Sequence, residues 1–421
     1  MKTSLELFTG AGGLALGLSR ASFAHVAVIE RDPVACQTIR HNKEAGTLLV
    51  AEWPLLEQDV AEIDFKQYAG VDVLAGGPPC QPFAISGKRR AHKDDRNMFP
   101  EMLRAVRELL PPVVLIENVT GLLRGQLERY FEYVLLQMRF PTVEKKRSES
   151  WTSHLVRLRR VSHRPPKGAT SYVVHDRVMQ AADFGVPQRR ERVFIVALRA
   201  DLQMSWQFPS PSHSLDALLW DQWVSGDYWR RHSVAKAHLP EISPKHVGRV
   251  AALKHLDKPS ALPWRTIRDA FADLPLPSIR GQQPGLANHV LVPGARVYPR
   301  HTGSPFDMPA KTLKAGAHGV PGGENILVSP DGAIRYFTIR ECARLQTFSD
   351  DYEFVGTWKS LVRQVGNAVP VALVESVGRA IHAQLREVDE RNTASRIGEA
   401  SRGNGLIDDA DHQERPRVPF H

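Results

Sequence analysis

The chain has 421 residues, 42% of them hydrophobic and 24% charged, with a formal net charge of +9. These proportions are those of a globular protein, and no apolar run approaches the roughly 20 residues of a membrane span. The sequence begins without a signal-peptide pattern, and its three separated cysteines give neither a disulfide framework nor a zinc spacing. We therefore expect a cytoplasmic protein, and the positive charge favours a polyanionic partner.

The first 200 residues alternate short apolar runs with amphipathic stretches such as Met98–Leu110, a pattern typical of a parallel α/β sheet. The predicted strands are Leu5–Phe8, Val26–Glu30, Val71–Ala75, Val113–Glu117, Tyr172–Met179 and Arg192–Leu198.

The composition changes after about residue 200, where Pro, Gly, His and Trp become frequent and periodicity weakens. This change predicts a second, irregular domain. Helical patterns return at Ile339–Thr347 and from Val369 to about Arg386. The last residues mix charges with small side chains and predict a disordered tail. The predicted divisions are 1–199, 200–334, 335–387 and 388–421.

Basic side chains crowd the connection before the strand at Tyr172. They are Lys145, Lys146, Arg147, Arg157, Arg159, Arg160, Arg164 and Lys167. We interpret this stretch as a solvated surface loop. The alternative is contact with phosphates at the rim of a nucleic-acid cleft.

A glycine-rich segment, LFTGAGGL at residues 7–14, follows the first strand and opens a helix. Glycines let the backbone approach a ligand, and a carboxylate twenty residues later, Glu30, can bind ribose hydroxyls. Asp59 stands where a third strand would end and could bind an adenine amine. Dinucleotide dehydrogenases share this pattern, and a tight structural turn would also explain it.

The segment GGPPCQPF at residues 76–83 follows another strand at the edge where ligands bind. Two prolines fix the backbone before Cys80, which makes this cysteine a candidate nucleophile. The alternative is a buried structural cysteine. Glu117 ends the strand VLIENV and would lie at the same edge as a proton donor or acceptor, or as a helix-capping acid.

These segments resemble the ordered motifs of the C5-cytosine DNA methyltransferase family. The motifs continue in order with QRRER at residues 188–192, RECARLQ at 340–346 and QVGNAVP at 364–370. The resemblance implies an S-adenosylmethionine-dependent methyltransferase fold, a Rossmann-like sheet with a smaller irregular target-recognition domain.

The resemblance also implies the chemistry. Cys80 would add to C6 of a cytosine flipped out of the duplex, and Glu117 would bind the base at N3 and the exocyclic amine. Arg190 and Arg192 would hold the base and tune these two groups. The residues implied for S-adenosylmethionine are Phe8, Gly10, Gly12, Gly13, Glu30, Asp59, Pro78 and Asn367. No metal is implied.

Residues 86–95 would form a loop that closes over DNA, and residues from about 200 to 330 would recognise the target, with Lys311–Gly316 as the boundary. Three features depart from the family pattern, and one of them is the basic stretch at 145–167, which is longer than the core pattern requires. Ala84 stands where serine is frequent, and Arg31 stands where an apolar or aromatic residue often covers the adenine.

The expected partner is double-stranded DNA, and the expected state is a monomer. A cognate restriction endonuclease acting on the same site is a further expected partner. Three alternatives stay open at this point. They are a tRNA cytosine methyltransferase, a DNA-binding regulator without catalysis, and, from the glycine loop alone, a nicotinamide-dependent oxidoreductase.

Overall fold

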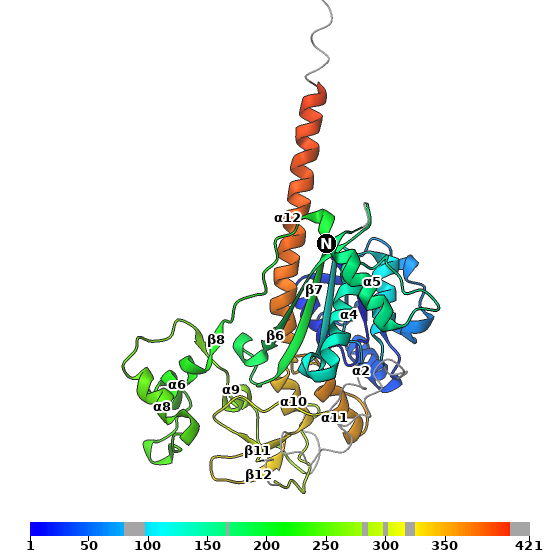
Figure 1. Cartoon of the computed structure of the whole chain (residues 1–421). Helices are drawn as coiled ribbons and strands as arrows, with labels where there is room; N and C mark the ends of the chain where they lie inside the picture. Colours follow the sequence, from blue (N-terminus) through cyan, green and yellow to red (C-terminus); the bar gives the residue numbers. More distant parts are fainter. Residues whose placement is uncertain (80–96, 166–167, 280–284, 298–301, 316–324, 405–421) are drawn as a thin grey trace, which may run out of the picture.

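The computed structural model describes residues 1–79, 97–165, 168–279, 285–297, 302–315 and 325–404. A seven-stranded sheet forms its centre, with strand order β3-β2-β1-β4-β5-β7-β6 (Figure 1). The strands are β1 (Lys2–Leu7), β2 (Phe23–Glu30), β3 (Leu55–Glu57), β4 (Val73–Gly76), β5 (Val113–Val119), β6 (Tyr172–Gln180) and β7 (Glu191–Arg199). All six predicted strands are confirmed. The sheet is mostly parallel, but β7 runs antiparallel to β5 and β6, which the prediction of a parallel sheet did not include.

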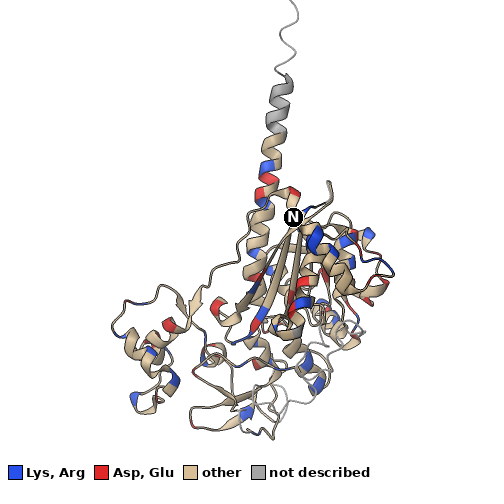
Figure 2. Ribbon diagram, viewed as in Figure 1, with Lys and Arg blue, Asp and Glu red and all other residues tan. Residues whose placement is uncertain are grey.

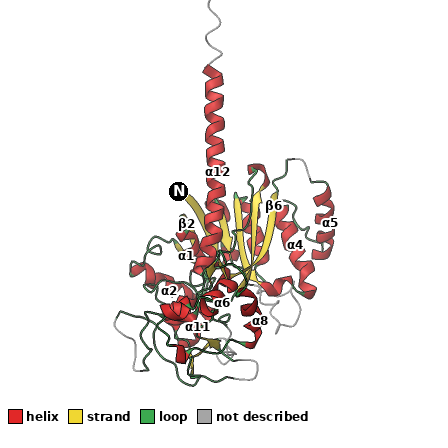
Figure 3. Ribbon diagram, turned by 90° about the vertical axis from the view of Figure 1, so that its left-hand side faces the viewer, coloured by secondary structure: helices red, strands yellow, loops and turns green. Residues whose placement is uncertain are grey.

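Helices cover both faces of this sheet, as the turned view shows (Figure 3). Alternate residues of β5 enter opposite cores, because successive strand side chains point to opposite faces. Val114 and Ile116 pack with α3 (Phe99–Leu109), α4 (Glu128–Arg139) and α5 (Trp151–His163). Val113 and Leu115 pack with α1 (Gly13–Arg20) and α12 (Val371–Asn404). A third core joins α1 and α2 (Pro33–Glu44) to α10 (Ile339–Leu345) and α11 (Trp358–Asn367).

Two sequence predictions are wrong in part. Leu155 and Leu158 are fully buried against the sheet, so much of the basic stretch forms helix α5 rather than a surface loop. The predicted disordered tail begins as the continuation of α12, which ends at Asn404. Arg391 donates hydrogen bonds to the carbonyls of Leu202 and Gln203 and so ties this extension to the end of the sheet domain.

The described residues between 200 and 334 form short helices and short strands. They are β8 (His213–Ser214), α6 (Leu215–Trp223), α7 (Asp227–Arg231), α8 (Pro244–Leu253), β9 (Leu262–Pro263), α9 (Ile267–Phe271), β10 (Ser304–Pro305), β11 (Ile326–Val328) and β12 (Ile334–Tyr336). Two small aromatic and aliphatic clusters join α6, α7 and α8. In the part of the chain that the structure describes, none of the helices is both long and apolar enough to span a membrane.

The packing of α1 against α12 depends on Gly17. A Cβ atom at this position would lie 2.6 Å from Cγ1 of Val374. We expect Gly17→Ala to lower the free energy of unfolding by about 1–3 kcal/mol, because the added methyl group overpacks a filled core. Denaturant unfolding measures the change. Gly248, a helical glycine in α8 with open space around it, gives the control: Gly248→Ala will be neutral or stabilising.

Glu6 is the penultimate residue of β1 and is 1% exposed. Burial raises its pKa well above the ordinary value. The protonated form is thus favoured in the folded state. At pH values below the unfolded pKa of about 4.3, the Glu6 carboxyl is protonated in both states, and its contribution to the free energy of unfolding is fully present. This contribution is lost as the pH rises through the folded pKa. We expect Glu6→Gln to unfold at a higher temperature than the parent at pH 8, with the difference shrinking toward pH 5. An unchanged difference at the two pH values would contradict this expectation.

Candidate active site

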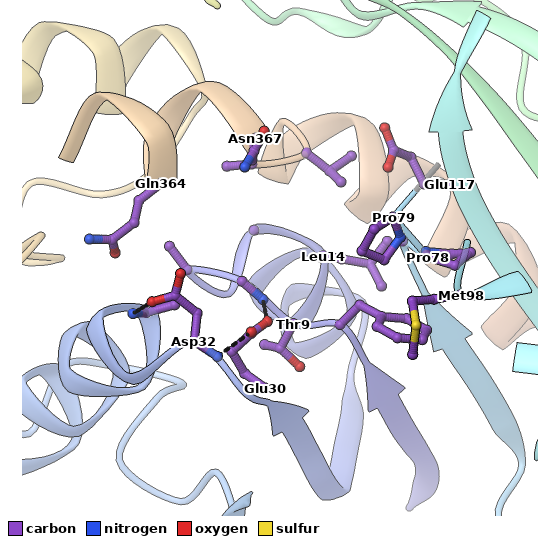
Figure 4. Close-up of a pocket in the computed structure, with 18 of the residues that line it drawn as sticks. Thr9, Leu14, Glu30, Asp32, Pro78, Pro79, Met98, Glu117, Gln364 and Asn367 are labelled. Carbon is purple, nitrogen blue, oxygen red and sulfur yellow. Dashed lines mark hydrogen bonds between the residues drawn. The ribbon is translucent and has the colours of Figure 1, made fainter. Parts of the chain in front are cut away.

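A cavity of about 490 Å³ lies at the carboxyl ends of β1, β2, β4 and β5. This is the edge of an open α/β sheet at which ligands bind, and the volume is suited to a small molecule. Its wall combines residues from the first 119 positions, Arg192 and the segment from Arg363 to Val369. Figure 4 shows Glu30 and Glu117 at opposite ends, with Asn367 across from Glu30.

Glu30 ends β2 and fixes the loops at one end of the cavity. One of its carboxylate oxygens accepts a hydrogen bond from the N–H of Gly10 at 2.7 Å. The other accepts from the N–H groups of Arg31 and Asp32 at 2.9 and 2.7 Å. A carboxylate has about four acceptor positions, so about one remains for a ligand hydroxyl.

The glycine loop contains residues that serve different purposes. Phe8 and Gly10 line the cavity with φ angles of 59° and 57°, and a Cβ on Gly10 would meet no atom within 4 Å. The backbone at Gly10 is therefore open to a ligand. A Cβ on Gly12 would lie 2.7 Å from the Trp53 ring, and one on Gly13 would lie 2.5 Å from the carbonyl of Val369. Gly12 and Gly13 are thus required by packing within the chain, although Gly13 also lines the cavity.

Asp59 follows β3 by two residues and lines the cavity beside Arg31. Its carboxylate accepts a hydrogen bond from the N–H of Ala61 and pairs with the Arg31 guanidinium at 2.8 Å. These two contacts lower the pKa of Asp59. Arg31, which stands where the family often has an apolar or aromatic residue, therefore forms an ion pair on the cavity wall.

The other end of the cavity holds a buried ion pair. The Nε atom of Arg192 lies 2.8 Å from Oε1 of Glu117, and the two side chains are 12% and 10% exposed. The antiparallel pairing of β5 with β7 brings the two residues together. Burial raises the pKa of Glu117, and the positive charges of Arg192 and Arg190 oppose this rise.

Arg190 lies behind this pair and is fully buried. Its guanidinium donates hydrogen bonds of 3.0, 2.7 and 3.0 Å to the carbonyls of Leu313, Gly366 and Ala368. Its described contacts are therefore with the chain itself and fasten the returning segment to β7. The sequence predicted that Arg190 helps to hold the base. These hydrogen bonds are within the chain, so that role stays a prediction.

Pro78 and Asn367 line the cavity, as the sequence predicted for ligand-binding residues. The side-chain amide of Asn118 donates a hydrogen bond of 3.0 Å to the Pro78 carbonyl and so fixes the strand end that leads to Cys80. Cys80, Ala84 and the predicted closing loop at 86–95 lie outside the described residues.

The sequence prediction did not name many residues of the cavity wall, among them Asp32, Arg363 and Gln364. Asp32 forms an ion pair with Arg363, and Gln364 donates a hydrogen bond to the Val355 carbonyl. Asp32 could have been found from its position before Pro33, a pattern typical of a helix N-cap. No sequence pattern joins it to Arg363, because only the fold brings α11 to α2.

Comparison with known proteins agrees with this architecture. The chain matches the model of the C-5 cytosine-specific DNA methylase family over residues 2–140, 168–254 and 291–383. The type II methyltransferase M.NgoMIV of Neisseria gonorrhoeae is 31% identical over 390 residues, which cover 91% of this chain and 98% of that protein. M.Eco47II of Escherichia coli is 32% identical over 397 residues, which cover 92% of this chain and 81% of that protein.

The solved structure of the S. pombe Dnmt2 methyltransferase has the same fold. It superposes with a TM-score of 0.53 at 19% identity, covering 91% of this chain and 99% of that one. The family match spans most of the chain and includes both walls of the cavity. The chain therefore belongs to the C-5 cytosine-specific DNA methylase family and is a DNA cytosine-C5 methyltransferase.

Proposed function

We propose that this enzyme methylates one cytosine within a short DNA sequence, with S-adenosylmethionine as the methyl donor. The observation that carries the proposal is that one cavity has two chemically different ends. One end has carboxylates beside an open glycine backbone, and the other has the Glu117–Arg192 pair beside the prolines that precede Cys80. A donor bound at the first end would present its methyl group toward a base at the second.

The residues present fit S-adenosylmethionine. The remaining acceptor position of Glu30 suits a ribose hydroxyl, and Asp59 suits the amine of adenine. Gly10 leaves room for the ligand, while Phe8, Pro78 and Asn367 complete the wall. When bound, S-adenosylmethionine supplies an electrophilic methyl group.

The chain's own residues would prepare the cytosine. The Cys80 thiolate forms a bond to C6, and the electron pair of the C5–C6 double bond moves into the ring, so that C5 becomes nucleophilic. Glu117 stabilises the charge that develops at N3, and Arg192 holds Glu117 in position. Loss of the C5 proton and cleavage of the sulfur–C6 bond then release the methylated base. The base must leave the helix stack, which costs a few kcal/mol.

Each segment of the chain has a separate role in this proposal. Residues 1–199 and 335–387 would form the catalytic and cofactor-binding domain, and residues 200–334 would read the DNA sequence. Segment 388–421 would be dispensable for chemistry. Because the similar proteins M.NgoMIV and M.Eco47II are type II methyltransferases, we include protection of DNA against a restriction endonuclease in the proposal.

Mapping the modified bases tests the function. Plasmid DNA is incubated with the purified protein and S-adenosylmethionine, and bisulfite sequencing then locates 5-methylcytosine. We expect methylation at one short recurring sequence. Methylation of tRNA but not of the plasmid would overturn the proposal, and scattered methylation without a common sequence would overturn its specificity.

A further inference from the structure

Three basic residues from separate segments form what we call the cation cluster: Arg189, Lys245 and Lys311. Backbone contacts align two of these segments, because the N–H of Arg189 donates to the Ala310 carbonyl at 2.7 Å. The hydroxyl of Thr312 donates to the Arg189 carbonyl at 2.8 Å. Burial lowers the pKa of Lys245, and the positive charges of Arg189 and Lys311 lower it further. Lys245 lines a cavity together with Phe306 and Met308, which lie just before Lys311 in the chain, so the start of α8 meets the same segment.

The cluster has few negative neighbours in the described part of the chain. Glu241 and Asp307 line a cavity together with Lys245, but Asp307 forms an ion pair with Arg268. Lys and Arg occur over both parts of the molecule (Figure 2), but many of them are paired. In α5, for example, Arg157 pairs with Glu149 and Arg159 with Glu132, so the basic stretch seen in the sequence is partly neutralised.

The start of α8 adds to the positive potential. Lys245 and His246 occupy its first turn, which contains no acidic residue, and the side chain of Ser243 makes no capping hydrogen bond. Cations are unfavourable at a helix N-terminus, where the helix dipole is positive. The pKa of His246 is lowered by burial and by Lys245, Arg249 and Arg189. An anion bound among these groups would remove the repulsion that the folded chain otherwise retains.

One member of the cluster is close in sequence to a residue of the cavity wall. Arg189 is three residues before Arg192, whose guanidinium pairs with Glu117 in the cavity wall. Lys245 belongs to the segment that would read the DNA sequence, and Lys311 to the segment that returns to the sheet domain. One anion on the cluster would therefore connect the recognition segment to the catalytic part.

We propose that Arg189, Lys245 and Lys311 bind backbone phosphates of duplex DNA beside the target cytosine, and that this contact fixes the recognition segment relative to the cavity. The inference rests on the proposed function, and it names Lys245 as a DNA-positioning residue of α8. Phosphate contacts position a protein on DNA without reading its sequence. The cluster should therefore contribute equally to the affinity for every duplex, whatever its sequence.

The salt dependence of binding tests the proposal. Fluorescence anisotropy measures the dissociation constant of labelled duplexes, with and without the mapped site, between about 50 and 200 mM salt. Each lost phosphate contact reduces the slope of log K against log salt by about 0.9. We expect a reduction of that size for Lys245→Ala and about three times as much for Arg189→Ala/Lys245→Ala/Lys311→Ala, on both duplexes. Lys254→Ala, at the other end of α8, should keep the parent slope.

Three results would overturn the inference. They are unchanged slopes in both cluster variants, a loss confined to the duplex that contains the site, and a loss seen with tRNA but not with duplex DNA. The outcome is separable from that of the proposed function. Plasmid methylation with unchanged slopes would refute only the phosphate contact. Reduced slopes in a protein that methylates no DNA would refute only the function.

Discussion

A Cys80→Ala variant will lose methyl transfer to DNA by at least about 10⁴-fold while it still binds S-adenosylmethionine. The reason is chemical, because C5 of cytosine becomes nucleophilic only when a thiolate adds to C6, and the alanine methyl group cannot form that bond. Transfer of labelled methyl groups to plasmid DNA measures the loss. Isothermal titration calorimetry with the cofactor shows whether the cavity survives.

Two further measurements make this result specific to Cys80. Cys342 in α10 is 3% exposed and its pKa is raised by burial, so Cys342→Ala should keep methyl transfer. Duplex DNA with 5-fluorocytosine at the mapped position should trap a covalent complex with the parent, because fluorine cannot leave C5 as a proton does. Cys80→Ala should form no such complex. Ordinary turnover by Cys80→Ala would refute the covalent mechanism.

A Glu117→Gln variant should slow methyl transfer by about 10²–10⁴-fold, the range that a positioned acid or base contributes. Glutamine has nearly the same shape, but it carries neither the charge that pairs with Arg192 nor an acidic proton for N3. We expect kcat to fall while the dissociation constants for duplex DNA and cofactor stay near those of the parent. Single-turnover kinetics on the mapped duplex measures the chemical step directly.

The same substitution leaves the buried Arg192 charge without its carboxylate, and the loss of such a partner costs about 3–5 kcal/mol of stability. Thermal unfolding of the variant therefore belongs in the experiment, and kinetics are taken at a temperature where it is fully folded. Glu128→Gln, an exposed change at the start of α4, is the matched control. A folded Glu117→Gln variant with turnover within about threefold of the parent would remove Glu117 from the chemistry.

The sequence was a sufficient guide to the strands and to much of the cavity wall. The predicted strands end at Glu30 and Glu117, and parallel strands bring such ends to one edge of the sheet. The direction of β7 was not predicted, because an apolar run has the same pattern in parallel and antiparallel pairing.

Other errors have equally local causes. In α5, Trp151, Leu155 and Leu158 recur at helical spacing, but the dense charges between them suggested a solvated loop. The role predicted for Arg190 came from its motif and stays a prediction, but the motif did not reveal its three carbonyl partners, which lie 123 to 178 residues further along the chain. Contacts at such separations are determined by topology, which a motif does not contain.

The position of α12 has a consequence for how the enzyme is made. This helix covers one face of the sheet and packs on α1, although it follows every strand of that sheet in the sequence. A nascent chain that ends before α11 therefore contains the strands of the sheet, with Glu30 and Glu117. One face of that sheet is still apolar and exposed, and Asn367 is missing from the cavity wall. A prematurely terminated chain would therefore have neither a finished core on this face nor a complete cavity wall.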